Sequence, residues 1–191
     1  MKAILLSLAL LFIPAAYAEA PEIKVAERSE PVAVALEESL NKKRAEITAA
    51  DLETVKELEL PHIHIKSFKE NDFAGLTKLK KLYFYSLLHN RGRTTDPIAI
   101  GDKVFAKLAS LETLKIQEQL GQLPDDVFAG LTSLKVLDLT NSTLTRLPTS
   151  LMALPKIETV YYDGRGLSKE DYATLQKKLG DKLKIKIEEE E

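Results

Sequence analysis

A hydrophobic pattern of the form L-x-x-L-x-L recurs five times along the chain at nearly constant spacing. The copies begin at positions 55, 79, 111, 134 and 157, which are 24, 32, 23 and 23 residues apart. The last two apolar positions of each copy are separated by a single residue, which is the period of a strand with one buried face. Because a unit of this length cannot bury its own apolar face, the pattern predicts a solenoid in which successive units stack and their strands form a parallel sheet.

A second apolar phrase lies between the strands. It reads Phe-Ala-x-Leu in three units, and the fourth unit lacks the aromatic residue; the four segments are Phe73–Leu76, Phe105–Leu108, Phe128–Leu131 and Leu151–Leu154. Apolar side chains three residues apart share a face of a helical turn. We therefore expect a short helical turn on the convex side of each unit.

The connection between the second and third units is about nine residues longer than the others. This predicts an insertion at 87–101, which places Arg91 and Arg93 beside a glycine. Insertions in repeat stacks form loops that often border the binding face, so both arginines are possible contacts. A tolerated surface insertion without a role is the alternative, because long loops cost little stability.

The segment before the repeats has the pattern of a helical cap. From Pro31 onward, apolar residues fall near i, i+4 and i+8 spacing, which predicts one amphipathic helix; they are Val32, Leu36, Leu40 and Ile47. The sequence Thr48-Ala-Ala-Asp51 predicts a capping box that opens a further helical turn. Residues 31–54 are therefore predicted to cover the first repeat.

The segment after the repeats predicts a second cap. Ser168-Lys-Glu-Asp171 can begin a helix that places Tyr172, Leu175 and Leu179 on one face, with Gly180 at its end. Beyond it, Leu183, Ile185 and Ile187 alternate with lysines, as in a final strand with one buried face. Residues 168–191 would thus form a helix-strand cap with an acidic tail, and the sheet would contain about six parallel strands.

The repeats resemble those of leucine-rich-repeat proteins. The resemblance is carried by residues 73–79, by Val127–Leu139 and by Leu144-Thr-Arg-Leu-Pro148, while Ile47–Leu58 looks like the entry into the repeats of bacterial internalin-like proteins. It implies an α/β solenoid, a short curved stack in which 55–167 are the repeats, and recognition of a protein or peptide on the concave face of the sheet. The asparagine that usually follows the strand is replaced here, so we expect less regular turns; the replacing residues are Ile63, Gln119, Ser142 and Arg165.

The N-terminal residues read as a targeting segment. Lys2 precedes an apolar run that is too short to span a bilayer, and Ala16-Tyr17-Ala18 has the form that signal peptidase cleaves. We therefore expect 1–18 to be a signal peptide and 19–30, which is charged and poor in large apolar residues, to be a flexible leader. The absence of cysteine-rich caps favours a bacterial exported protein, which we expect in the periplasm or else secreted.

Composition and charge narrow the possible chemistry. The 191-residue chain has 27 basic and 29 acidic residues, so its formal net charge of −2 gives no general attraction to nucleic acid or to an anionic membrane. It contains no cysteine, which excludes disulfides, catalytic thiols and thiolate metal sites. His62-Ile-His64 supplies only two ligands, too few for a zinc site. We expect no enzyme activity, no cofactor, no metal and no membrane span.

Strand alternation predicts the binding face. If the apolar positions of each strand point inward, the residues between them form one continuous outer surface; these residues are Glu59, Tyr83, Tyr85, Lys115, Gln117, Asp138, Thr140 and Tyr161. Exposed tyrosines on a rigid sheet are favourable interface residues. The leading interpretation is a non-catalytic exported module that binds a protein or peptide. The alternatives are a protein that binds glycan or cell envelope, and a soluble inhibitor of an exported hydrolase.

Overall fold

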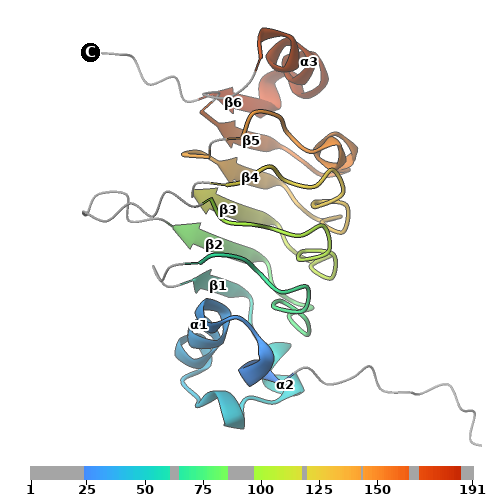
Figure 1. The fold of residues 1–191 in the computed structure, drawn as a ribbon. Coiled ribbons are helices and arrows are strands. Elements are labelled where there is room, and N and C mark those ends of the chain that lie inside the picture. Colours follow the sequence, from blue (N-terminus) through green and yellow to red (C-terminus); the bar gives the residue numbers. More distant parts are fainter. Residues whose placement is uncertain are drawn as a thin grey trace, which may run out of the picture.

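Six parallel strands form one sheet in the computed structural model, which describes residues 24–60, 65–85, 97–117, 120–142, 144–163 and 168–185. Their spatial order follows the chain, and Figure 1 shows them stacked from β1 to β6. The strands are β1 (Glu57–Leu60), β2 (Lys81–Tyr85), β3 (Thr113–Gln117), β4 (Val136–Leu139), β5 (Thr159–Tyr162) and β6 (Leu183–Ile185). The predicted α/β solenoid with about six parallel strands is confirmed.

The core is built from two rows of apolar side chains that point to the same side of the sheet. One row aligns Leu58, Leu82, Leu114, Leu137, Val160 and Leu183 across the six strands. The second row holds the next inward position of β1 to β5, that is Leu60, Phe84, Ile116, Leu139 and Tyr162, each at most 1% exposed. Parallel pairing in constant register therefore places like positions of successive repeats against each other, as the alternation predicted.

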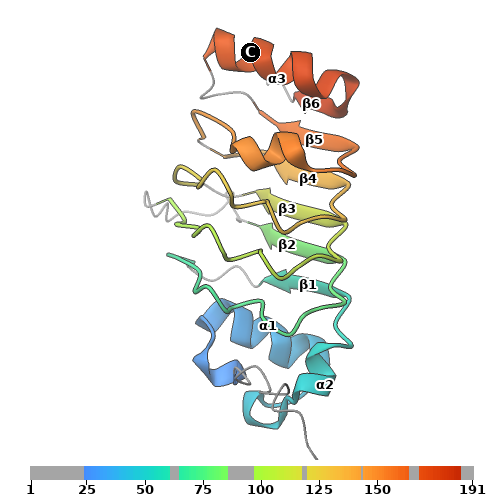
Figure 2. The same ribbon diagram turned by 90° about the vertical axis from the view of Figure 1, so that its right-hand side faces the viewer.

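The returning segments form a second layer along one side of the strands (Figure 2). Their phenylalanines are buried, and the rings of Phe73 and Phe105 stack at 5.9 Å between centroids. These segments are not α-helical. The first three contain successive i→i+3 turns, such as Leu76 N to Phe73 O at 3.3 Å, and only the fourth is a 3₁₀ helix, η3 (Thr149–Ala153). The spacing therefore predicted the turns correctly. Their hydrogen bonds join residues three apart, whereas those of an α-helix join residues four apart.

The predicted insertion ends earlier than expected. Residues 97–101 belong to the returning layer, because Ala99 donates its N–H to Lys66 O at 3.0 Å and Gly121 donates to Ile98 O at 3.2 Å. Ile98 and Ile100 are buried in the core. Arg91 and Arg93 lie outside the described residues.

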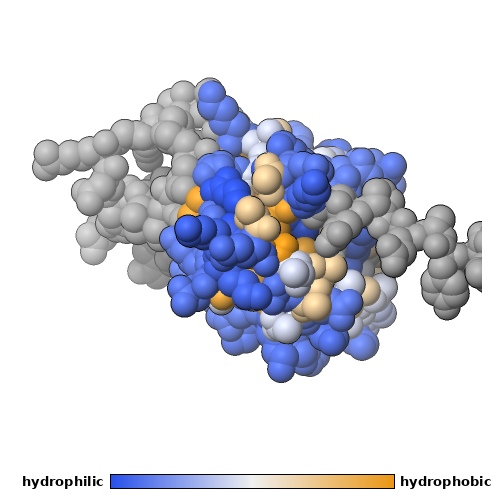
Figure 3. Space-filling view, turned by 90° about the horizontal axis from the view of Figure 1, so that it is seen from below, coloured by the Kyte–Doolittle hydropathy of each residue, from blue (hydrophilic) through white to orange (hydrophobic). Residues whose placement is uncertain are grey.

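The N-terminal cap consists of three short helices rather than one long one. Helix α1 (Glu30–Leu40) buries Val32 and Leu36 and packs on β1. It ends where Asn41 adopts a left-handed conformation with φ of 49°, so the single helix predicted to reach Ile47 is wrong. The 3₁₀ helix η2 (Arg44–Glu46) and α2 (Ala49–Leu52) follow. The lower end of the stack is mostly hydrophilic around a small apolar area (Figure 3).

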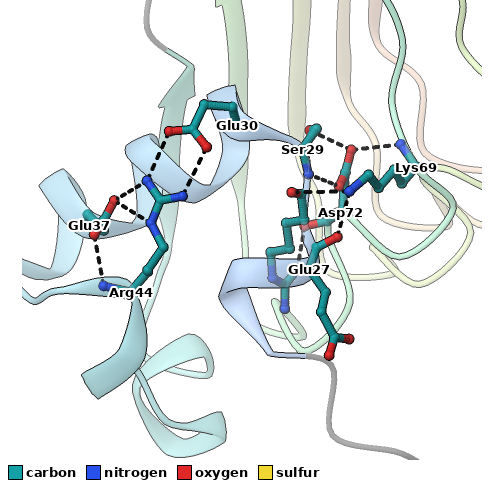
Figure 4. Close-up of polar contacts among 8 residues, drawn as sticks. Glu27, Ser29, Glu30, Glu37, Arg44, Lys69 and Asp72 are labelled. Atoms are coloured by element: carbon teal, nitrogen blue, oxygen red, sulfur yellow. Dashed lines mark hydrogen bonds and ion pairs between the residues drawn. The ribbon is translucent and has the colours of Figure 1, made fainter.

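Two polar motifs hold this cap together. The predicted capping box is confirmed: Thr48 Oγ1 accepts from Asp51 N, and Thr48 N donates to the Asp51 carboxylate at 2.9 Å. Arg44 bridges Glu30 and Glu37, with contacts of 2.8 to 3.1 Å (Figure 4). These bonds fix the turn after α1, where the chain reverses towards the first repeat.

The residues just before α1 are bound to the first repeat, so the expected flexible leader is wrong for residues 24–30. The 3₁₀ helix η1 (Val25–Glu27) buries Val25. The buried Arg28 guanidinium donates to the carbonyl oxygens of three residues in the first returning segment, Asn71, Asp72 and Ala74. We call residues 24–29 the N-terminal strap.

The Asp72 carboxylate completes this attachment. It accepts from the backbone N–H groups of Ser29 and Lys69 and from the Ser29 hydroxyl, each at 2.7 Å (Figure 4). Burial lowers the pKa of Arg28, while the Asp72 charge opposes that shift. The positions that correspond to Asp72 in the next two repeats are Val104 and Val127. A carboxylate is buried here because the strap supplies its donors.

Up to Ile185, the C-terminal cap agrees with the sequence pattern except at one residue, whereas Ile187 and the acidic tail lie outside the described residues. Ser168 accepts a hydrogen bond from Asp171 N at 3.0 Å and begins α3 (Lys169–Leu179), which leads through the 3₁₀ helix η4 (Gly180–Lys182) to β6. Leu175 and Leu179 are buried, but Tyr172 is 36% exposed. The predicted apolar face therefore includes the two leucines alone.

Candidate protein-binding face

The side of the sheet opposite the core carries the candidate site, and we call it the open face. Its central row takes one residue from each strand in register: Glu59, Tyr83, Lys115, Asp138, Tyr161 and Lys184. A second row nearer the start of the strands begins with Glu57, Lys81 and Thr113, which are also in register. No described helix packs across this face, because α1 packs on β1 and α3 on β6, the two end strands.

Two of the three tyrosines of this face are stacked on each other, and the third is exposed. The rings of Tyr83 and Tyr85 stack at 5.7 Å between centroids with an interplanar angle of 19°. Lys115 Nζ lies 5.5 Å from the Tyr83 ring centroid, within the range of a cation–π contact. Tyr161, on β5, is 41% exposed. The face therefore presents a stacked pair of tyrosines on β2 and a single tyrosine on β5, with β3 and β4 between them.

The polar groups between the tyrosines are fixed by hydrogen bonds. Asp138 accepts from the Thr140 hydroxyl at 2.8 Å and from Thr140 N at 3.1 Å. Gln117 Nε2 donates to Asp138 Oδ2 at 3.0 Å and to the Thr140 hydroxyl at 3.2 Å. These bonds orient the Gln117 amide and bury Asp138 to 7% exposure. Asp138 thus positions its neighbours and presents little surface itself, unlike the exposed residue that alternation predicted.

The charges of the face are partly paired. Glu57 and Lys81 form an ion pair of 3.1 Å, and this contact raises the pKa of Lys81. Partial burial and the nearby charge of Glu57 raise the pKa of Tyr83, while burial and Glu59 raise that of Tyr85. Both phenols therefore remain protonated hydrogen-bond donors at neutral pH.

A line of charged residues borders the face where the strands begin. Glu112 lies between Lys80 and Lys135, at 2.8 and 2.9 Å. The hydrogen bond from Lys80, followed by that from Lys135, lowers the pKa of Glu112 to about 2. The backbones of the same three residues are also hydrogen-bonded: Glu112 N donates to Lys80 O, and Lys135 N donates to Glu112 O. These contacts link neighbouring repeats and leave the open face accessible.

The structure brings the sequence-predicted residues together on one face. Strand alternation places Tyr161 outward and Tyr162 inward, at 41% and 0% exposure, as predicted. The sequence reasoning omitted Lys184, although the alternation of β6 contained the signal for it. It also overlooked the ion pair of Glu57 and Lys81, because partners on neighbouring strands become visible only once the register is known.

Within the described ranges, no group of three or more His, Asp or Glu side chains could hold a metal ion. No helix in the same part of the chain is long and apolar enough to cross a membrane.

Comparisons with known proteins agree with this architecture. The family model described as leucine rich repeat matches residues 117–164, and no curated protein matches the sequence. A leucine-rich-repeat protein of Leptospira interrogans has a similar solved structure, with a TM-score of 0.57 and 25% sequence identity. The match covers 74% of this chain and 34% of that protein, so this chain spans about a third of its length.

Two internalins of Listeria monocytogenes also match. One has a TM-score of 0.39 and 14% identity over 81% of this chain and 56% of its own length. The second, internalin C2, has a TM-score of 0.35 and 16% identity over 82% and 93%. These scores are too low to support a detailed comparison.

The in-register strands, the turn layer and the matched repeats define a solenoid of the kind that presents one sheet face for interaction. The chain contains leucine-rich repeats, which the family model matches over 117–164, and it folds as a leucine-rich-repeat solenoid. Proteins of this class are generally non-enzymatic interaction modules.

Proposed function

We propose that this protein is a non-catalytic, exported binding module that recognises a protein or peptide on the open face of its sheet. The observation that carries the proposal is the set of tyrosines on this face: Tyr83 and Tyr85, which are half-buried and stacked on each other, and Tyr161, which is exposed. Tyrosine rings contribute large contact area at low entropic cost, which is why they are common in binding surfaces. The Arg91 and Arg93 segment is a second possible contact region.

The polar groups of the face would supply specificity. The Gln117 amide is oriented by Asp138 and Thr140 before any partner arrives, so little entropy is lost when it forms a new bond. Preorganised aromatic and amide groups could also stack on and bond to sugar rings. A glycan or cell-envelope ligand is therefore the second candidate, supported by the exposed ring of Tyr161.

The double variant Tyr83→Ala/Tyr85→Ala tests the proposal. Truncation of a central interface residue typically costs about 2 kcal/mol or more, which is roughly thirtyfold in affinity. We expect the variant to lose capture of protein from an envelope extract of the source organism while its melting transition changes little. Lys177→Ala/Lys178→Ala on the exposed side of α3 is the control.

Three outcomes separate the possibilities. Unchanged protein capture by the tyrosine variant contradicts the proposed site, and loss on replacing Arg91 and Arg93 would move it to their segment. Retention of purified peptidoglycan instead of protein, in a tyrosine-dependent manner, would favour the glycan-binding alternative.

We further propose export to the periplasm, or alternatively secretion, on the basis of residues 1–18. N-terminal sequencing of the exported protein should begin near Glu19. A soluble cytosolic product that retains Met1 would contradict export.

A further inference from the structure

The central row of the open face has a symmetric chemical order. From β1 to β6 it reads acid, aromatic, base, acid, aromatic, base, through Glu59, Tyr83, Lys115, Asp138, Tyr161 and Lys184. When the row is read from the other end, every charge is replaced by its opposite and every aromatic residue by an aromatic residue. A surface with this order is complementary to itself.

A two-fold axis converts this order into contacts between two copies. If the axis runs parallel to the strands, between β3 and β4, the open faces meet and β1 of one copy lies against β6 of the other. In the central row, Glu59 then faces Lys184, and Lys115 faces Asp138. Tyr83 faces Tyr161, and each pair occurs twice because a two-fold interface is isologous.

The central pairs are physically compatible. Glu59 and Lys184 are exposed, and neither has an ion-pair partner among the described residues. Asp138 is only 7% exposed, but its carboxylate accepts three hydrogen bonds from Gln117 and Thr140 and keeps one of about four acceptor sites for a further donor. Tyr83 and Tyr161 are both accessible for aromatic contact across the interface.

The rows on either side of the central row follow this rule only in part, because Lys81 faces Thr159 and Tyr85 faces Asp163. Extending the register of β5 and β6 by one residue places Lys182 opposite Thr159 in the sheet, and the two-fold axis then brings Lys182 to Glu57. Thr113 meets Val136, and Gln117 meets Thr140. No like charges face each other in these pairings.

A second way to join two open faces, with the axis through the central row, is electrostatically unfavourable. A two-fold axis along the stack would place each strand against the same strand of the second copy. Lys115 would then meet Lys115, and Glu59 would meet Glu59. Like-charge contacts across an interface cost free energy, so the sequence favours the axis parallel to the strands.

We propose that the open face associates with the open face of a second copy of this chain, in a two-fold dimer with its axis parallel to the strands. This inference rests on the proposed function, because it assigns a partner to the same surface. Six strands about 4.8 Å apart span about 24 Å, and each strand is about 15 Å long. That footprint is smaller than a standard interface of about 800 Å² per partner, so the dimer is weak and depends on concentration and salt.

The test is a charge-reversal series measured by sedimentation velocity of the full exported chain over a range of concentrations. Lys184→Glu places two acids together at both ends of the dimer and should weaken association by about tenfold or more. Glu59→Lys should act in the same way. The double variant Glu59→Lys/Lys184→Glu restores opposite charges and should return the dissociation constant to within about threefold of the unmodified protein.

The control and the results that would overturn this inference differ from those that test the proposed function. Lys178→Glu makes the same change on the exposed side of α3 and should leave association unchanged. A protein that is monomeric at all concentrations, or a dimer for which the double variant fails to restore association, overturns the inference. If it is monomeric but still captures another protein through Tyr83 and Tyr85, the proposed function stands and only the self-association is wrong.

Discussion

Tyr161 and Tyr162 are adjacent in sequence and lie in opposite environments. Tyr161 is 41% exposed on the open face, whereas Tyr162 is fully buried and donates its hydroxyl to Leu144 O at 2.5 Å. The difference follows from the alternation of strand side chains. The two residues therefore provide a matched pair that separates the stability of the core from binding by the face.

We predict that Tyr162→Ala lowers the free energy of unfolding by about 3–5 kcal/mol, because it removes a large buried aromatic side chain. Tyr162→Phe should cost about 1–3 kcal/mol, since the buried Leu144 carbonyl loses its donor. Tyr161→Ala should change stability by no more than about 0.5 kcal/mol. Urea denaturation of the three variants measures these differences. Equal destabilisation by both alanine substitutions would contradict the assigned alternation.

Residue environments were predictable from the sequence where they depend on local alternation. Leu82 and Phe84 point inward and Tyr83 outward because successive strand side chains alternate, and this holds in every repeat. The burial of Asp138 was not predictable, because it depends on Gln117 from the neighbouring strand. The sequence indicates which side of the sheet a residue occupies, but not which neighbours then cover it.

In the caps, too, the features that depend on nearby residues were predictable from the sequence, and those that depend on distant residues were not. The helix starts at Thr48 and Ser168 were predicted because their capping bonds involve residues only three positions away. The N-terminal strap was missed because its bonds join residues more than 40 positions apart. The aligned valines at 104 and 127 are the one available signal, since they show that Asp72 occupies an otherwise apolar position.

We predict that Asp72→Val, which introduces the residue of the next repeats, releases the strap. The Ser29 and Lys69 N–H groups lose their acceptor, and Arg28 loses the nearby negative charge. The expected cost is about 2–4 kcal/mol of unfolding free energy, with faster proteolysis within residues 24–29. Asp126→Val, at an exposed position, is the control and should change stability by no more than about 0.5 kcal/mol. Equal stability and proteolysis of the two variants would show that the strap does not depend on Asp72.

At the scale of the whole molecule, the two faces of the sheet have different roles. One face is sealed by the turn layer, and the two ends of the stack are covered by helical caps (Figures 1 and 2). The open face presents its tyrosines and most of its charged residues in rows fixed by the strand register. We therefore expect binding to take place on the open face.

Site-specific photo-cross-linking tests this claim most directly. A photoreactive phenylalanine analogue would replace Tyr83 or Tyr161 on the open face and, in separate proteins, Lys107 or Ala129 on the exposed side of the turn layer. We expect cross-links to a protein, either a second copy or another partner, from positions 83 and 161, and none from 107 and 129. Cross-links that form from the turn layer and are absent from the open face would contradict this claim.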